Sequence, residues 1–287
     1  MTGNSLSTEK KTSFSTFVAL PQVRQKIADI IGGKKGDGFI ASIVTAVSSN
    51  PQLQACDQNT ILSSALLGAA LNLSPSPQLG HFYMVPFKDN KNKRTVAQFQ
   101  LGYKGYVQLA IRSAQYRNIN VIALKQGEVL RWNELTEEIE YELMEDWEAR
   151  ESAPTVGYYA YFELTNGFRK AMYWTHSRMM AHAKKYSRGF ESDLKNNTRY
   201  TFWSKDFDGM AYKTMLRQLI SKWGIMSVEM QDAFTGDMAV IQDDGNREYV
   251  DNSDIEPVMI EEVSPQPVAA PEVDEVLDVN LEQAFFG

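Results

Sequence analysis

The spacing of hydrophobic positions predicts a helical region at the start of the chain. Apolar residues recur at helical intervals over 21–31, 39–49 and 57–71. The first of these helices begins with a proline, which suits a first helical position, and the third begins at an aspartate, which is a favoured N-cap. Residues 1–20 open with a Ser/Thr/Lys-rich run and are expected to be disordered, and the glycine-rich 32–38 is predicted to be a flexible link.

Farther along the chain, the pattern changes to short apolar runs that indicate strands. Aromatic and β-branched residues flank a polar, basic turn in 79–101, and a Thr-Asn-Gly turn joins two more such runs in 155–175. Both segments are predicted to be β-hairpins, with helices at 105–116, 176–188 and 207–222. The fold class that follows is α+β, with a small antiparallel β-sheet of two hairpins backed by helices.

The charge of the chain is strongly segregated. From Gly236 to Gly287 the sequence has 14 acidic residues and one basic residue, a net charge of −13. The preceding residues hold 28 of the 29 bases and 22 of the 36 acids, a net charge of +6. A basic body with an acidic tail is typical of polyanion-binding proteins, although the tail could equally be a solubilising appendage. The predicted domains are therefore a basic core at 21–235 and an acidic flexible tail at 236–287.

Two segments leave alternatives open. The tail ends with Leu277, Leu281, Phe285 and Phe286 at helical spacing, which fits either a short docking peptide or an unstructured end. The basic turn at 88–94 is either a solvated loop tip or a finger that reaches a phosphate backbone.

The stretch 98–117 contains the strongest candidate for binding chemistry, a turn from a strand into a helix. Gly102 and Gly105 flank Tyr103 and Lys104, and glycines let the backbone approach another group closely. The first amides of the following helix lack partners within the helix and favour an anion. Ring, cation and free amides together suit a base stacked beside its phosphate, although an ordinary exposed turn also explains the pattern.

Basic and aromatic residues alternate in two segments, 81–131 and 168–222. Between Arg169 and Lys222 the sequence has 12 bases and four acids. A groove lined by both segments could contact the phosphates of a nucleic acid. The predicted DNA-binding residues are Tyr103, Lys104, Arg112, Arg117, Lys185, Arg188, Lys213 and Arg217.

Several motifs of enzymatic chemistry are absent from the sequence. It has no Walker-type phosphate loop, no dinucleotide-binding glycine motif and no His-Glu-x-x-His, so no nucleotide or other cofactor is predicted. Asp206 and Asp208 with Lys213 could form the metal site of a nuclease, but acids at this position also cap a helix. Magnesium is compatible with the sequence without being indicated by it.

The sequence also bears on the cellular compartment. The single cysteine, Cys56, rules out an internal disulfide and fits a reducing cytoplasm. No apolar run reaches the ~18 residues of a membrane-spanning helix, and the N-terminus lacks the apolar core of a signal peptide. We therefore expect a cytoplasmic protein without membrane partners.

Three blocks of the sequence resemble the RecT family of phage-type single-strand annealing proteins. The two main blocks are QFQLGYKGYVQLAIRS at 98–113 and FWSKDFDGMAYKTMLRQLISKWG at 202–224, and LLGAALNLSPSPQLGHFYMVPF at 66–87 supports them. The blocks occur in the family's order, and the likeness runs through residues 40–235.

The resemblance implies ATP-independent annealing of complementary strands in recombination, by a homo-oligomer that forms rings or filaments on DNA. It implies that the protein binds single-stranded DNA and annealed duplex, and that it works in a bacterial host cell with a partner exonuclease or a host single-strand binding protein. It also implies an α+β fold. Two other classes stay open, namely a metal-dependent nuclease and a protein that coats single strands without annealing them.

Overall fold

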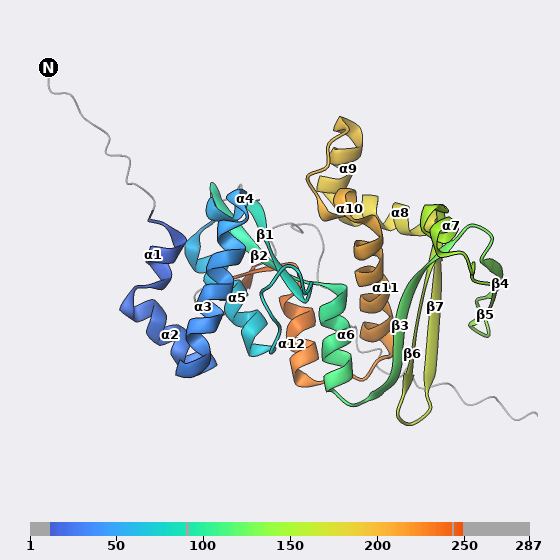
Figure 1. The fold of residues 1–287 in the computed structure, drawn as a ribbon, viewed down its shortest axis with the longest axis horizontal. Coiled ribbons are helices and arrows are strands. Elements are labelled where there is room, and N and C mark those ends of the chain that lie inside the picture. Colours follow the sequence, from blue (N-terminus) through green and yellow to red (C-terminus); the bar gives the residue numbers. More distant parts are fainter. Residues whose placement is uncertain (1–11, 90–91, 243, 249–287) are drawn as a thin grey trace, which may run out of the picture. The chain divides into compact units, whose positions relative to one another are not determined.

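The computed structural model describes residues 12–89, 92–242 and 244–248. All of these residues belong to one compact unit, Met1–Asp251, in which the strands form three antiparallel sheets (Figure 1). The helices are α1 (Phe14–Val18), α2 (Pro21–Ile31), α3 (Gly33–Ser48), α4 (Pro51–Gln54), α5 (Gln58–Ala70), α6 (Tyr103–Arg112), α7 (Trp147–Ser152), α8 (His176–Tyr186), α9 (Arg188–Asn196), α10 (Phe202–Lys205), α11 (Phe207–Trp223) and α12 (Val228–Gly236). The strands are β1 (Phe82–Asp89), β2 (Arg94–Leu101), β3 (Tyr116–Lys125), β4 (Val129–Asn133), β5 (Glu138–Tyr141), β6 (Thr155–Leu164), β7 (Arg169–Thr175), β8 (Ala239–Ile241) and β9 (Arg247–Glu248).

Helices α1 to α5 form the N-terminal helical region that the sequence predicts. Helix α2 begins at Pro21 as expected, and Asp57 caps α5 by accepting a hydrogen bond from the Asn59 amide at 3.0 Å. Across the part of the chain that the structure describes, every helix is too short or too polar to cross a bilayer.

Two segments that the sequence predicts to be flexible are helical. Helix α1 lies within residues 1–20, and its Phe14 and Val18 are buried in the main core. Helix α3 begins at Gly33, so the predicted link at 32–38 is mostly the start of this helix, with Gly36 buried against Ile27 of α2. In both places tertiary packing outweighs the weak helix propensity of the local sequence.

The first predicted hairpin is confirmed as β1–β2, which pair over all eight residues of each strand in a sheet of order β1-β2-β8-β9. Helix α5 packs directly on this sheet. The Ala97 amide donates to the Thr60 hydroxyl at 2.9 Å, and the Ser64 hydroxyl donates to the Ala97 carbonyl at 3.2 Å. A Cβ on Gly68 would lie 2.2 Å from the Phe82 ring. The small residues of α5 therefore serve core packing.

The second predicted hairpin, β6–β7, is also confirmed, but it lies in a separate sheet of order β3-β6-β7. Helix α11 covers one face of this sheet with its buried Met215, Leu219 and Ile220. On the other face, Trp132 of the β4–β5 hairpin packs against Tyr159. The α+β class is confirmed, and the two hairpins belong to different sheets instead of forming one.

The folded body continues beyond residue 235, where the sequence suggests that the tail begins. After α12, strand β8 pairs with β2 and strand β9 pairs with β8. Asp237, the first acidic residue of the predicted tail, is only 1% exposed. The core therefore extends at least to residue 248, and the predicted docking end of the chain lies outside the described residues.

Candidate nucleic-acid interface

The turn that the sequence singles out forms the start of α6. Gly102 is the N-cap residue in an extended conformation, and the helix begins at Tyr103. A Cβ on Gly102 would lie 2.1 Å from the Gly80 carbonyl oxygen, and a Cβ on Gly105 would lie 2.1 Å from the His81 carbonyl oxygen. The two glycines are therefore needed because the chain before β1 packs directly on the helix start. Their role is explained by the protein's own backbone and does not require a ligand.

Half-buried aromatic rings and two exposed lysines surround this helix start, and we call them the aromatic–lysine junction. Tyr103 of α6 meets Tyr212 of α11 edge-on, with ring centroids 5.4 Å apart. Tyr83 of β1 meets Phe202 of α10 at 5.3 Å. The junction consists of Tyr83, Tyr103, Lys104, Phe202, Lys205 and Tyr212.

The two lysines of the junction come from segments about a hundred residues apart, and each lies beside a residue that neighbours Tyr83. The Lys205 ammonium lies 6.0 Å from the centre of the Phe202 ring. The side chain of Lys104 passes beside Gly80, and the Tyr83 hydroxyl lies against the same glycine. All three sequence blocks that carry the family resemblance therefore contribute side chains to this one site.

Burial and nearby charges fix the protonation of Tyr83 in the junction and of His81 beside it. Burial raises the pKa of Tyr83, and the Asp206 carboxylate raises it further, so the hydroxyl remains protonated at neutral pH. Burial lowers the pKa of His81, and the positive charges of Arg112 and Lys104 lower it further. His81 therefore adds no positive charge at neutral pH, and the positive field at this helix start comes from basic side chains.

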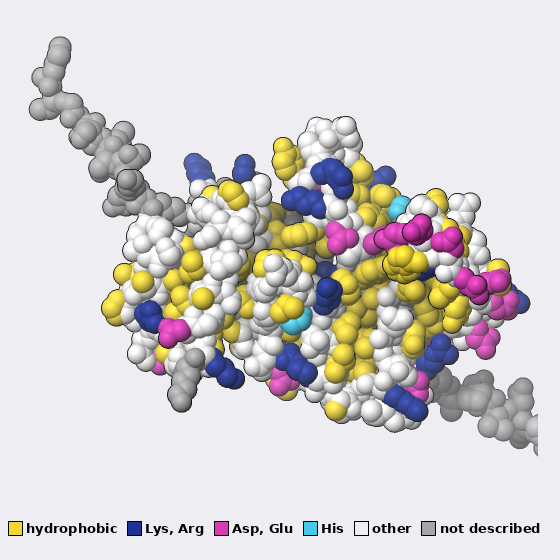
Figure 2. All heavy atoms as spheres, in the orientation of Figure 1, with side chains coloured by type: hydrophobic (Ala, Val, Ile, Leu, Met, Phe, Trp, Pro, Cys, Tyr) yellow, Lys and Arg dark blue, Asp and Glu magenta, His cyan; other side chains and the backbone are white. Residues whose placement is uncertain are grey.

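A second basic group lies where α8 and α9 cover the N-terminal end of α11. Phe207 at the start of α11 packs against Phe190 of α9, with ring centroids 6.0 Å apart. Lys185 and Arg188 are exposed in this region, and α9 contacts the helix α10 that carries Phe202. Figure 2 shows lysine and arginine side chains around α9 and α10, whereas acidic side chains form a band near α7 and the β4–β5 hairpin.

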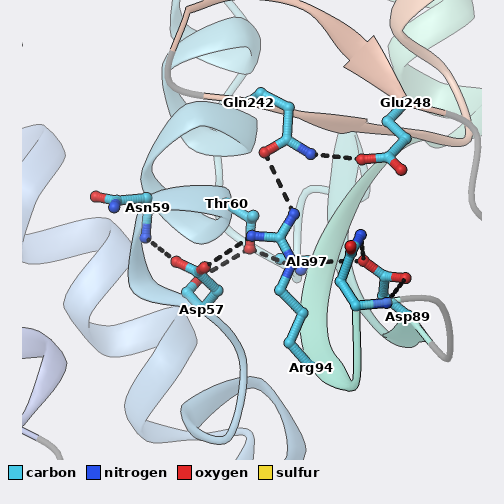
Figure 3. A network of polar contacts seen from close by, with 9 residues as sticks. Asp57, Asn59, Thr60, Asp89, Arg94, Ala97, Gln242 and Glu248 are labelled. Atoms are coloured by element: carbon cyan, nitrogen blue, oxygen red, sulfur yellow. Dashed lines mark hydrogen bonds and ion pairs between the residues drawn. The ribbon is translucent and has the colours of Figure 1, made fainter.

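One residue of the basic turn in the first hairpin, Arg94, is held by carboxylates of the protein itself (Figure 3). The Arg94 guanidinium lies 3.2 Å from the Asp57 carboxylate and 3.4 Å from the Asp89 carboxylate. It also donates to the Gln242 side-chain oxygen at 3.5 Å, and Gln242 donates to Glu248 at 2.7 Å. Arg94 therefore links the start of α5 to β1 and to the loop that follows β8. Its side chain is held by the protein and does not extend towards a ligand.

Lys213 and Arg217, which the sequence predicts to bind phosphate, surround a buried carboxylate. Lys213 Nζ lies 2.8 Å from Asp237 Oδ1, and an Arg217 nitrogen lies 2.6 Å from Asp237 Oδ2. The Tyr106 hydroxyl donates to the same Oδ2 at 3.0 Å, and the Leu101 amide donates to Oδ1 at 2.9 Å. We call these five residues the Asp237 cluster. It joins β2, α6 and α11 to the segment that follows α12.

The charges of the Asp237 cluster are balanced inside the protein. The Lys213 side chain is 9% exposed and the Arg217 side chain 38%. Burial opposes ionisation of Asp237, but the charges of Lys213 and Arg217 outweigh it and hold the pKa of Asp237 below its usual range. Both basic residues therefore act first as partners of Asp237.

Lys104 and Arg217 lie on different sides of α6. Tyr106 faces α11, because its hydroxyl also accepts a hydrogen bond from Arg217 at 3.2 Å. Lys104 precedes Tyr106 by two residues, which places it about 200° away around the helix. The lysine therefore projects away from the α6–α11 contact, where Arg217 lies.

Arg112 and Arg117 lie at the last turn of α6 and the start of β3, and both have partners within the protein. Arg112, in the last turn of α6, donates to the Leu71 and Asn72 carbonyls at 2.6 and 3.2 Å. It thus provides hydrogen-bond donors for two carbonyl groups that follow α5. Arg117 of β3 pairs with Glu163 at 3.2 Å and stays 69% exposed.

The predicted site residues thus fall into three places. Because the Tyr116 hydroxyl donates to the Ile225 carbonyl at 2.9 Å, the start of β3 lies at the C-terminal end of α11, far from the junction. Tyr103, Lys104, Lys185 and Arg188 lie at the junction end, Lys213 and Arg217 in the Asp237 cluster, and Arg112 and Arg117 around the last turn of α6 and the start of β3.

Comparison with known proteins identifies the family. The sequence model of the RecT family matches residues 37–256, a range that includes all three blocks and strands β8 and β9. The chain belongs to the RecT family. An uncharacterised protein of Bacillus subtilis strain 168, YqaK, is 44% identical over 235 residues, which cover 82% of this chain and 73% of YqaK. Protein RecT of Escherichia coli strain K12 is 25% identical over 231 residues, 79% of this chain and 81% of that protein.

RecT-family proteins are annealing proteins and not classical enzymes. Membership therefore supports a role in DNA recombination by single-strand annealing and implies binding to single-stranded DNA.

The aspartates considered above for nuclease chemistry have structural partners in this RecT-family chain. Asp206 is the N-cap of α11 and accepts a hydrogen bond from the Gly209 amide at 2.9 Å, which confirms the capping interpretation. Asp208 accepts a hydrogen bond from the Tyr158 hydroxyl at 2.6 Å. Within the described ranges, no group of three or more His, Cys, Asp or Glu side chains is arranged to hold a metal ion.

Sequence reasoning missed four of the six junction residues, namely Tyr83, Phe202, Lys205 and Tyr212. All four lie inside the RecT-like blocks at 66–87 and 202–224, so the resemblance marked their segments. Periodicity within one segment could not show which of its residues face α6, because that depends on contacts between distant segments.

Proposed function

We propose that this protein anneals complementary single-stranded DNA without ATP, as a homo-oligomer on DNA during homologous recombination. The observation that supports the proposal best is the aromatic–lysine junction, where rings and lysines from all three RecT-like blocks lie together. Aromatic rings suit unpaired bases, and lysines suit the phosphates between them. Annealing forms no covalent bond, so a surface that holds strands is sufficient.

The basic residues have different roles in this proposal. Lys104, Lys185, Arg188 and Lys205 bind phosphates along the junction end, and Tyr103 supports the DNA backbone or stacks on a base. Contacts to phosphate carry no sequence information, so base pairing alone selects the partner strand. Lys213, Arg217 and Arg112 hold the framework, and Arg117 is left to contact DNA at the opposite end of the protein.

Oligomerisation extends the binding surface along DNA and makes binding multivalent. The partners that we propose are single-stranded DNA, the annealed duplex, further copies of this chain, and an exonuclease or a host single-strand binding protein. The protein would act in the cytoplasm of a bacterial host, where its DNA substrate is found, and without a cofactor.

One gel experiment separates this function from the two alternatives. Complementary labelled oligonucleotides are mixed with the protein without ATP, with magnesium in one arm and EDTA in the other. Rapid appearance of duplex in both arms supports annealing. Fragments that appear only with magnesium, and that an Asp206→Asn variant no longer makes, indicate a nuclease. Bound strands that stay unpaired indicate a coating protein and would overturn the proposal.

The role of the acidic tail is tested with a truncation placed according to the structure. A chain that ends after Thr235 would lose Asp237 and strand β8, so loss of activity there would report on folding. A chain that ends after Glu248 keeps both. We expect the chain that ends after Glu248 to bind single strands at least as tightly as the full chain. It lacks ten of the 14 acidic residues that follow Thr235 and would repel DNA.

A further inference from the structure

The loop between α9 and α10 carries an exposed ring. Tyr200 is 73% exposed, more than any other Phe, Trp or Tyr in the part of the chain that the structure describes. One exposed ring is ordinary on a protein surface, so the groups around Tyr200 decide whether it serves binding. Nothing in the aromatic–lysine junction uses this residue, although Phe202 of the junction follows it by two positions.

A buried carboxylate holds this loop in shape. Asp193 of α9 is 3% exposed and accepts hydrogen bonds from the Tyr200 amide at 3.0 Å and the Thr201 amide at 2.8 Å. The hydroxyls of Thr198 and Ser204 donate to the same carboxylate at 2.6 and 2.7 Å. Burial opposes ionisation of Asp193, but these hydrogen bonds outweigh it and hold its pKa well below the usual range. The backbone that presents Tyr200 is therefore fixed before any ligand arrives.

The surroundings of the ring are basic. Arg199, directly before Tyr200, is exposed, and its Nε donates to the Ser204 carbonyl at 3.0 Å, which orients the guanidinium. Lys205 and Arg188 are exposed on the neighbouring helices α10 and α9. An aromatic face with cations beside it, on a rigid loop, matches an unpaired base with its flanking phosphates. A preformed loop also binds with little loss of conformational entropy.

We propose that Tyr200 is a base-stacking residue, on whose ring one unpaired base of single-stranded DNA lies while Arg199 contacts a flanking phosphate. This inference rests on the proposed function and adds a reason for selectivity. In a duplex the faces of each base are covered by its neighbours in the stack, so Tyr200 has no face to bind. The loop between α9 and α10 therefore favours single strands over double strands.

Photochemical cross-linking tests the contact directly. The full chain is bound to a short dT oligomer that carries one 5-iodouracil, irradiated, and digested with trypsin. Cleavage after Arg199 and Lys205 releases the peptide YTFWSK, residues 200–205. We expect a cross-link on Tyr200 that Tyr200→Phe keeps and Tyr200→Ala loses. A cross-link map without residue 200 would overturn the inference.

Affinity measurements supply the second readout. Tyr200→Ala should bind the short dT oligomer roughly 5- to 150-fold more weakly, the range expected for one lost base–aromatic stack. Tyr200→Phe should stay within about twofold of the wild type, because the ring is the part that stacks. The slope of log Kd against log salt should be unchanged in both variants, since no phosphate contact is removed.

A matched control separates this contact from a general effect of losing a tyrosine. Tyr141→Ala removes a ring that is 56% exposed on β5, in the acidic part of the surface, and should leave binding unchanged. All variants should melt at the wild-type temperature. If the wild type binds single strands and Tyr200→Ala binds them equally well, the role of Tyr200 fails while the proposed function stands. If the wild type binds no single strands, both fail.

Discussion

The Asp237 cluster and the aromatic–lysine junction are built on the same two helices, α6 and α11, with their adjoining segments, yet they use positive charge in opposite ways. In the cluster, Lys213 and Arg217 neutralise a carboxylate that is 1% exposed. In the junction, Lys104 and Lys205 are exposed beside aromatic rings. A charge removed from water needs a partner, whereas an exposed charge is available to a ligand. Basic residues close together in sequence therefore need not form one binding surface.

The largest effect on stability is expected when the buried carboxylate of the Asp237 cluster is removed. Asp237→Ala leaves Lys213 and Arg217 without their carboxylate, and removing one partner of a buried ion pair costs about 3–5 kcal/mol. Urea unfolding should show a loss of this size in the free energy of unfolding. The matched control is Asp232→Ala on α12, whose carboxylate is 57% exposed and pairs with Arg247 at 3.4 Å. That variant should lose less than ~1 kcal/mol, and equal losses in both would contradict the structural role of the cluster.

Burial without an opposite charge provides the second test. His182 lies between the Trp174 and Tyr186 rings, at 5.4 and 4.5 Å, and burial followed by the charge of Lys185 lowers its pKa from 6.5 to about 4. The unfolded chain therefore takes up this proton first as the pH falls. The contribution of His182 to stability is complete above pH 6.5 and is lost as the pH falls towards 4.

We expect this loss to be about 2 kcal/mol, because His182 is only partly buried and water screens part of the effect. The measurement is the free energy of unfolding of the wild type and of His182→Phe at several pH values between 7 and 4. The variant keeps a ring in the same place but cannot be protonated, so it should become the more stable protein as the pH falls. A constant difference across this range would show that the pKa of His182 is not lowered.

The third effect concerns the framework that connects the cluster to the junction. Gly105→Ala places a Cβ 2.1 Å from the His81 carbonyl oxygen, so the backbone before β1 must move away from α6. We expect a loss of about 1–3 kcal/mol in thermal or urea unfolding and weaker binding to single strands, because Tyr83 moves with this segment. Gly38→Ala on α3 is the control. Nothing lies within 4 Å of its Cβ position, and alanine is the better helix former there. A Gly105→Ala protein as stable as the control would show that the close approach is dispensable.

Much of this fold follows from local sequence, as the hairpin turns and the Asp57 cap show. Alternating apolar runs fixed the positions of β1–β2 and β6–β7, and the glycines of 98–117 marked the start of α6. Local composition failed where distant contacts decide the outcome. Helix α1 forms because Phe14 and Val18 reach the core, a contact with distant residues that the Ser/Thr/Lys-rich composition of this segment does not reveal.

The candidate site was harder to predict than the fold for the same reason. The sequence predicts that Lys213 binds DNA, and it cannot reveal the buried ion pair because the partner lies 24 residues later, in a segment whose composition resembles an acidic tail. Lys205 and Phe202 were overlooked although they stand in a RecT-like block, because only their contacts with Tyr83 and its neighbours show where they face. Whether a charge is buried depends on the tertiary structure, so helical spacing alone cannot separate a DNA contact from a buried ion pair.

The smallest expected effect distinguishes the two uses of charge most directly. Lys104→Ala should reduce the slope of log Kd against log salt for single-stranded DNA by about 0.7, the value for one lost phosphate contact, with no change in melting temperature. Lys213→Met should lower the melting temperature, because it leaves Asp237 with one basic partner fewer. It should leave the slope unchanged, because it removes no exposed charge. Lys222→Ala, exposed at the far end of α11, should change neither quantity. If Lys213→Met flattened the salt dependence as much as Lys104→Ala, the lysine of the cluster would have to reach DNA, and the division between framework and binding charges would be wrong.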